Sequence, residues 1–112
     1  VLPAIHVSDL EALDEETQLE IMQMTTLAKH LLDRTLQPQG FNVGLNLGKA
    51  AGAGLADHLH VHIVPRWFGD TNFMPIVANT RVLPEWLGET YQRLHAMLDT
   101  IWPPASTLAP LP

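Results

Sequence analysis

The chain contains 112 residues, carries a net charge of −6 and has no cysteine. This length suits one domain with its own core, and the lack of cysteine excludes disulfide bonds and cysteine-based zinc sites. The acidic balance, without any basic patch, argues against nucleic acid as a partner. Because the sequence shows neither a membrane-spanning apolar run nor a signal peptide, we expect a cytoplasmic protein with no membrane partner.

The N-terminal part of the chain predicts an extended segment, a turn and a long helix. The Val-Leu-Pro of residues 1–3 is typical of the end of a strand, which predicts an N-terminally incomplete domain. Residues 8–11 suit a helix cap and a turn, and Asp14 marks the start of a helix that runs to about Leu36. The expected apolar stripe of this helix contains Leu19, Met22, Leu27, Ala28, Leu31 and Leu32.

Residues 41–47 alternate in polarity, which predicts a strand. One face carries Phe41, Val43, Leu45 and Leu47, and the other carries Asn42, Gly44 and Asn46. A half-exposed strand with its polar residues turned outward explains this pattern equally well. If the strand pairs with the histidine-rich run that follows, its amides and glycine lie beside the imidazoles, where they suit a phosphate group.

A second alternating run, residues 58–64, has a histidine at every other position. Because successive residues of a strand point to opposite faces, His58, His60 and His62 share one face. The other face carries Leu59, Val61 and Ile63. We expect Pro65 to end the pairing of this strand. The preceding residues 48–57 form a glycine-rich loop, which suits either a flexible hairpin connection, the commoner case, or an anion site made of backbone N–H groups.

The C-terminal part predicts a short strand, a helix and an irregular tail. Residues 73–77 are apolar and strand-like, and Pro84 marks the start of a helix that continues to about Thr100. Its expected apolar side contains Trp86, Leu87, Tyr91, Leu94 and Leu98. The prolines of residues 103–112 predict a loose tail, which leaves residues 1–102 as the domain. The order of elements predicts an α+β fold, with an antiparallel sheet and helices packed on one face.

Three imidazoles on one strand face suggest a site rather than packing, because histidine is uncommon and titrates near neutral pH. A solvated and inert face is one alternative. A metal site is another, since three histidines and a water can hold zinc. Three such positions on a straight strand, however, spread over about 13 Å. The outer two cannot readily reach one ion, so His6 would have to supply a ligand in place of one of them.

Covalent nucleotidyl or phosphoryl transfer fits these residues better. A neutral imidazole is a good nucleophile at phosphorus, and its adduct is labile enough to turn over. One histidine would attack while its neighbours bind phosphate oxygens or fix its tautomer. The amides of Asn42 and Asn46 and the loop N–H groups of Gly52 and Gly54 would stabilise the developing charge. This chemistry requires no cofactor of the protein, although the substrate phosphates can carry a divalent cation.

Residues 58–64 resemble the signature of the HIT (histidine triad) superfamily, His-φ-His-φ-His-φ-φ with φ apolar. The resemblance extends through Asn42, Asn46, the glycine loop and His6, which follows a Val-Leu-Pro segment as the family's upstream histidine does. Residues 64–74 look like those of a prokaryotic branch that includes diadenosine tetraphosphate phosphorylases and hydrolases. The resemblance covers nearly the whole chain and implies a HIT-like fold.

The resemblance also implies roles for individual residues. His60 would be the nucleophile that attacks the α-phosphorus and forms a nucleotidyl-histidine, with its Nδ1 hydrogen-bonded to the backbone carbonyl of His58. His62 would bind a phosphate oxygen or the leaving group, Asn46 would contact phosphate, and His6 would help to order the triad. Water or inorganic phosphate would then release AMP or ADP.

The chain departs from the family pattern in two respects. Leu55 stands where many members carry serine or threonine, and the family's base and ribose pocket lies largely in strands that would precede Val1. The resemblance further implies a homodimer packed through the long helix and the sheet edge. A nucleotide-binding or scaffold protein with little turnover is the alternative to an enzyme that hydrolyses or phosphorolyses dinucleoside polyphosphates or AMP conjugates.

Overall fold

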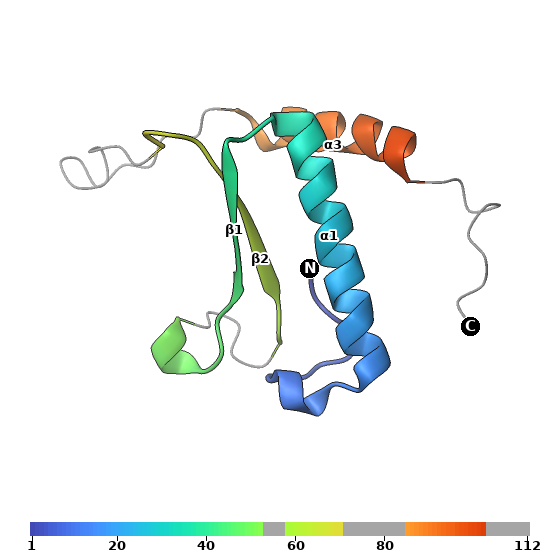
Figure 1. The fold of residues 1–112 in the computed structure, drawn as a ribbon, viewed down its shortest axis with the longest axis vertical. Helices are drawn as coiled ribbons and strands as arrows, with labels where there is room; N and C mark the ends of the chain where they lie inside the picture. Colours follow the sequence, from blue (N-terminus) through green and yellow to red (C-terminus); the bar gives the residue numbers. More distant parts are fainter. Residues whose placement is uncertain (53–57, 71–84, 103–112) are drawn as a thin grey trace.

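The computed structural model describes residues 1–52, 58–70 and 85–102. In chain order, its elements are the 3-10 turn η1 (Leu10–Ala12), helix α1 (Glu15–Leu36), strand β1 (Gly40–Leu45), the 3-10 turn η2 (Lys49–Ala51), strand β2 (Val61–Arg66) and helix α3 (Leu87–Ile101). Figure 1 shows α1 lying along the two strands, with α3 crossing the end of α1 from which the chain enters β1. This arrangement confirms the predicted α+β fold. Neither of the two helices described is both long and apolar enough for a membrane span.

Helix α1 begins and ends where the sequence predicts. The carboxylate of Asp14 caps its N-terminus by accepting a hydrogen bond from the backbone N–H of Thr17 at 2.7 Å. Hydrogen bonds from Thr17 also hold the pKa of Asp14 below the ordinary aspartate value. At the other end, Gln37 adopts the left-handed conformation with φ of 50°, and its N–H donates to the carbonyl of Asp33. This residue stops the helix before Pro38.

The predicted apolar stripe of α1 is partly wrong. The buried residues of the helix are Ile21 and Thr25, one turn apart, whereas Leu19 and Met22 are 60% and 61% exposed. Half-buried positions continue the inner face beyond Thr25, and these include Leu27, Ala28, Leu31 and Leu32. The side of the helix that packs on the sheet is therefore rotated away from Leu19 and Met22, which leaves these two side chains at the surface.

Strands β1 and β2 pair antiparallel, from Gly40 opposite Arg66 to Leu45 opposite Val61. The prediction that Pro65 ends the pairing is wrong, since Pro65 lies opposite Phe41 and β2 continues to Arg66. Among the described residues the sheet has two strands, and the missing N–H of a proline is tolerated at a strand edge that no other strand covers.

Both strands are shorter than predicted, β1 at its C-terminal end and β2 at its N-terminal end. β1 ends at Leu45 rather than at residue 47, and β2 begins at Val61 rather than at residue 58. Because β1 ends opposite Val61, residues 58–60 have no partner on β1. They pair instead with the N-terminal segment, where the N–H of Leu59 donates to the carbonyl of Val7 at 2.7 Å.

The N-terminal segment lies between the sheet and α1 (Figure 1). Val1 exchanges two backbone hydrogen bonds with Val61, at 3.0 and 2.7 Å. Residues 1–3 are not part of a described strand, but this exchange between Val1 and Val61 is the pairing that the predicted strand end would form. Pro3 has no N–H to donate, and the chain bends at residues 4 and 5.

The apolar face of the histidine run is at the centre of the core. Leu59 and Val61 are 3% and 8% exposed, and with Leu13 and Ile21 they form the buried cluster. The half-buried side chains that pack against it are Val1, Val7, Leu10, Leu45 and Ile63. The core therefore depends on the same short run that carries the histidines.

Helix α3 begins at Leu87, three residues later than predicted. Glu85 precedes it and accepts hydrogen bonds from the Thr90 hydroxyl at 2.6 Å and from Arg93 at 2.8 Å. Arg93 also donates to the backbone carbonyl of Thr35 at 2.7 Å, which joins α3 to the end of α1.

The predicted apolar side of α3 is wrong over its first turns. The side chains of Trp86, Leu87 and Tyr91 are exposed, whereas Leu94 and Leu98 are half-buried. The helix meets α1 through its later turns, so the first turns lie beyond the part of α1 that could cover them. The predicted strand at residues 73–77, Pro84 and the tail at residues 103–112 lie outside the described residues.

The burial of Leu59 generates a stability prediction. Leu59→Ala removes a side chain from the centre of the core and should lower the free energy of unfolding by about 2–5 kcal/mol. Leu87→Ala makes the same chemical change at an exposed position of α3 and should change it by less than about 0.5 kcal/mol. Urea-induced unfolding of the two variants would measure both values, and equal losses would contradict the described core.

Candidate active site

The three histidines lie on the face of the run that points away from the core. Leu59 and Val61 are buried and Ile63 packs against them, whereas His58 and His60 are half-buried and His62 is exposed. The predicted alternation is therefore confirmed. Its chemical consequence is that three imidazoles remain accessible on a backbone that its own apolar side chains hold in place.

The tautomer of His60 follows from its hydrogen bond. Its Nδ1 lies 2.9 Å from the backbone carbonyl oxygen of His58. A carbonyl oxygen can only accept, so Nδ1 carries the proton and the neutral ring presents the lone pair of Nε2. This is the contact that the family resemblance implied. The arrangement leaves Nε2 able to act as a nucleophile or to accept a proton.

The tautomer of His58 is the opposite one. Its Nε2 lies 2.9 Å from the carbonyl oxygen of Pro3, so by the same argument Nε2 carries the proton. The rings of His6 and His58 lie with their centroids 4.3 Å apart, and those of His60 and His62 lie 4.6 Å apart. All four predicted histidines thus form one group, in which the N-terminal segment fixes His58.

Polar residues of β1 line the same face of the sheet as His62. Gly44 lies opposite His62. Asn42 shares that face of β1 because it is two residues from Gly44, and Asn46, just beyond the end of β1, lines the same groove as His62. A groove of about 310 Å³ runs over this face. Its lining consists of Asn42, Val43, Gly44, Leu45, Asn46, His62 and Val64. The predicted placing of both asparagines beside the imidazoles is confirmed.

The glycine loop touches the site through Asn46. The side-chain amide of Asn46 donates to the carbonyl of Gly52 at 3.4 Å, a long contact. Gly52 has φ of 84°, a left-handed conformation that a side chain would strain. The other two predicted positions of this loop, Gly54 and Leu55, lie outside the described residues.

Sequence reasoning missed a cluster at the far end of the groove. Both oxygens of Asp70 accept hydrogen bonds from the Arg66 guanidinium, at 2.5 and 2.8 Å, and a third N–H of Arg66 donates to Oδ1 of Asn42 at 2.7 Å. The hydrogen bond and then the charge of Asp70 raise the pKa of Arg66. The four-residue spacing of Arg66 and Asp70 could have indicated their ion pair. The contact of Arg66 with Asn42 could be predicted only from the register of the two strands.

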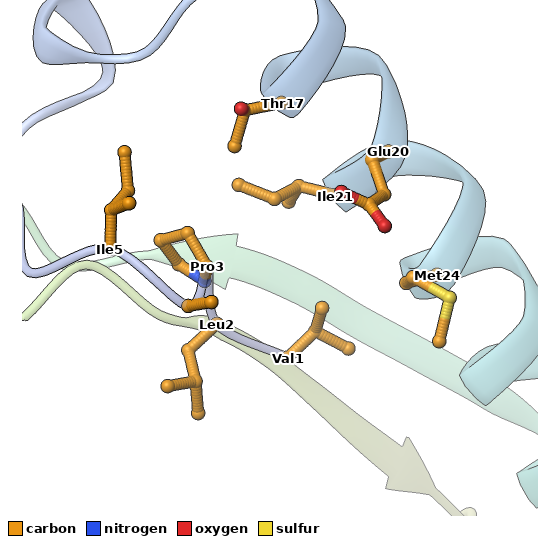
Figure 2. Close-up of a pocket in the computed structure, with 9 residues that line it drawn as sticks. Val1, Leu2, Pro3, Ile5, Thr17, Glu20, Ile21 and Met24 are labelled. Carbon is orange, nitrogen blue, oxygen red and sulfur yellow. The ribbon is translucent and has the colours of Figure 1, made fainter. Parts of the chain in front are cut away.

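Two cavities adjoin the N-terminal segment. One, of about 360 Å³, has residues 1–5 as one wall and α1 as the other, and Figure 2 shows Ile5, Thr17 and Ile21 turned toward one another across it. The second, of about 330 Å³, is lined by Val1, Leu2, Val61, His58 and His60. Only the second cavity reaches the histidines, and its wall of Val1 and Leu2 is apolar.

Within residues 1–52, 58–70 and 85–102, no three histidine, aspartate or glutamate side chains lie close enough to hold a metal ion together. Hydrogen bonds to carbonyl oxygens already engage one ring nitrogen each of His58 and His60. These contacts leave Nε2 of His60 with its lone pair, and the ring of His60 lies beside His62, which lines the groove that carries the amide groups.

Comparisons with known proteins agree with this site. The model of the HIT domain family matches residues 1–69. Two curated relatives named AP-4-A phosphorylase, from the CDC 1551/Oshkosh and H37Rv strains of Mycobacterium tuberculosis, are each 47% identical over 102 residues. The match covers 91% of this chain and 50% of each relative. The chain therefore spans about half the length of the curated relatives it matches.

The solved structures lead to the same family. The crystal structure of a zinc-bound histidine triad family protein from Mycobacterium smegmatis is 28% identical to this chain, with a TM-score of 0.66. The similarity covers 88% of this chain and 66% of that protein. With the histidine run, its hydrogen bonds and the family match all in place, the chain belongs to the HIT domain family.

The hydrogen bonds predict opposite tautomers for two neighbouring histidines. His60 should carry its proton on Nδ1 and His58 should carry it on Nε2, because each nitrogen faces a carbonyl oxygen. Nitrogen-15 NMR of the ring nitrogens, at about pH 8.5 where histidine side chains are generally neutral, would distinguish the two. The exposed His30 on α1 serves as the control and should average over both tautomers. Identical tautomers at His58 and His60 would contradict the described contacts.

Proposed function

We propose that this protein is a nucleotide hydrolase or phosphorylase that acts at the α-phosphate of dinucleoside polyphosphates or AMP conjugates. The observation that carries the proposal is the hydrogen bond from Nδ1 of His60 to the carbonyl of His58, which leaves Nε2 as a nucleophile. The relatives named AP-4-A phosphorylase support diadenosine tetraphosphate as the substrate to test first.

The proposed reaction has two displacements at the same phosphorus. Nε2 of His60 attacks the α-phosphorus and forms a P–N bond, while the P–O bond to the leaving nucleotide breaks and its electron pair stays with the leaving oxygen. Water or inorganic phosphate then attacks the nucleotidyl-histidine, and the P–N electron pair returns to Nε2. Water gives AMP after loss of a proton, and inorganic phosphate gives ADP.

The neighbouring residues have proposed roles in binding charge. His62 is exposed beside Gly44 and is available to a phosphate oxygen or to the leaving group. The amides of Asn42 and Asn46 and the loop N–H groups of Gly52 and Gly54 would stabilise the charge that develops on the phosphate. His6, whose ring lies tilted against that of His58 with the centroids 4.3 Å apart, would keep the group of imidazoles in order.

A nucleotide-binding protein with little turnover is the second candidate. The observation that favours it is Leu55, which replaces the serine or threonine of many family members and offers no hydroxyl to the phosphate or leaving oxygen. This candidate shares the groove and the histidines with the first. The two differ in whether a covalent intermediate forms on His60.

Product analysis separates the candidates. The full chain would be incubated with diadenosine tetraphosphate, with and without inorganic phosphate, and the nucleotides separated by chromatography. ADP and ATP formed only with phosphate would identify a phosphorylase, and AMP and ATP in both conditions would identify a hydrolase. Binding of AMP without any product would favour the second candidate and contradict the first.

The role of His60 predicts the loss of turnover on substitution. His60→Asn removes the nucleophile and should lower kcat/KM by about 10³-fold or more. The matched control, His30→Asn, changes an exposed histidine of α1 away from the site and should leave turnover unchanged. In the wild type, rapid quenching in an alkaline denaturant, in which a histidine P–N bond survives, followed by mass spectrometry should detect protein carrying one AMP group, which His60→Asn should lack. Retained turnover in His60→Asn would refute the assignment.

We also propose that the protein is a homodimer packed through α1 and the sheet edge. The exposed apolar side chains of Leu19 and Met22 on α1 support this proposal, because burying them would be favourable. Light scattering should give twice the chain mass for the wild type. The double substitution Leu19→Glu with Met22→Glu should shift the mass to that of a monomer, and a monomeric wild type would contradict the proposal.

A further inference from the structure

Arg66 joins two side chains on opposite sides of its guanidinium. Its Nε and one terminal nitrogen donate to the two oxygens of Asp70, at 2.5 and 2.8 Å, in the two-point geometry that fits a carboxylate. The other terminal nitrogen donates to Oδ1 of Asn42 at 2.7 Å. The pair with Asp70 fixes the plane of the guanidinium, so the N–H that reaches Asn42 has a defined direction.

The contact decides which end of the Asn42 amide faces the groove. An asparagine side chain has an oxygen that accepts and a nitrogen that donates, and it can turn either toward a neighbour. Arginine has only donors, so Arg66 can bind only the oxygen. The nitrogen of Asn42 is thereby turned away from Arg66, and its N–H groups remain for another partner.

The orientation of this amide matters because Asn42 lines the same groove as Gly44 and His62. An anion in the groove requires donors, and an amide turned the other way would present its oxygen and repel a phosphate. We propose that Arg66, held by Asp70, is a positioning residue that orients the Asn42 amide as a hydrogen-bond donor to the substrate's phosphate chain. This inference rests on the proposed function, since it assumes that the groove takes a phosphate chain.

The position of the cluster at the surface favours this role over a purely structural one. The side chains of Arg66 and Asp70 are 45% and 23% exposed. Ion pairs at the surface contribute little to stability. Arg66 also lies beyond the histidines along β2, on the strand that carries His62. Its effect on the reaction should therefore appear in phosphate binding rather than in folding.

A double-mutant cycle on the full chain tests the proposal. The variants are Arg66→Met, Asn42→Ala and the two together, with Arg34→Met as the matched control for the loss of an exposed arginine on α1. Asn42→Asp is a further variant, which keeps an oxygen for Arg66 but has no N–H to donate. Two quantities are measured for each: the KM for diadenosine tetraphosphate, and the Kd for inorganic tripolyphosphate by calorimetry.

We expect Arg66→Met to raise the KM and the Kd for tripolyphosphate about fivefold to tenfold, with the melting temperature unchanged, because a charge-assisted contact is lost. Asn42→Ala and Asn42→Asp should raise them at least as much. The decisive result is the double variant, which should bind no more weakly than Asn42→Ala alone, since Arg66 would act only through Asn42. Arg34→Met should match the wild type.

The other outcomes overturn the proposal in distinguishable ways. If Arg66→Met raises the Kd for tripolyphosphate by the same factor in the wild type and in Asn42→Ala, then Arg66 acts through its own charge or through the fold. In that case the positioning role is refuted while the proposed function stands. If the wild type binds tripolyphosphate and shows the coupling but turns over no substrate, the positioning role stands and the proposed function fails. If the wild type binds neither probe, both are refuted.

Discussion

The pairing of the N-terminal segment with residues 59–61 is the constraint on which the rest of the structure depends. β1 ends opposite Val61, so the backbone that carries His58 and His60 has no partner on that strand. Hydrogen bonds with Val1 and Val7 hold it instead, and the apolar side chains of Leu59 and Val61 fix it from the other side. Because side chains alternate along this run, its place in the core determines where the imidazoles point.

Backbone carbonyls then determine the chemistry of the imidazoles. The carbonyl of His58 selects the tautomer of His60, and the carbonyl of Pro3 selects the opposite tautomer of His58. Neither contact requires a charged partner, which is consistent with the neutral ring that the proposed attack on phosphorus requires. The groove supplies further polar groups, since the side-chain amides of Asn42 and Asn46 line it together with His62.

Features that depend on residues close together in the chain, such as alternation along a strand or a helix cap, could be predicted from the sequence. The bounds of α1, its cap at Asp14, the two faces of the histidine run and the asparagines beside His62 all follow from such patterns. Features that depend on distant segments could not be predicted in this way. The start of β2 depends on where β1 ends, and the exposure of Leu19 and Trp86 depends on which side of each helix meets its neighbour. The Arg66 contact with Asn42 joins residues far apart in the chain, so no local pattern indicates it.

The separation of the contacting segments also bears on how the site assembles during folding. Val1 and Val61 are 60 residues apart, and Pro3 and His58 are 55 apart. Helix α1 needs only contacts within one turn and forms rapidly, whereas contacts at long separation require closure of a large loop and slow the folding of a chain. The orientation of the His60 ring is thus a product of completed tertiary structure. Partly folded chains with α1 already formed would lack this orientation, so the proposed reactivity of His60 would report on native assembly more strictly than helical content does.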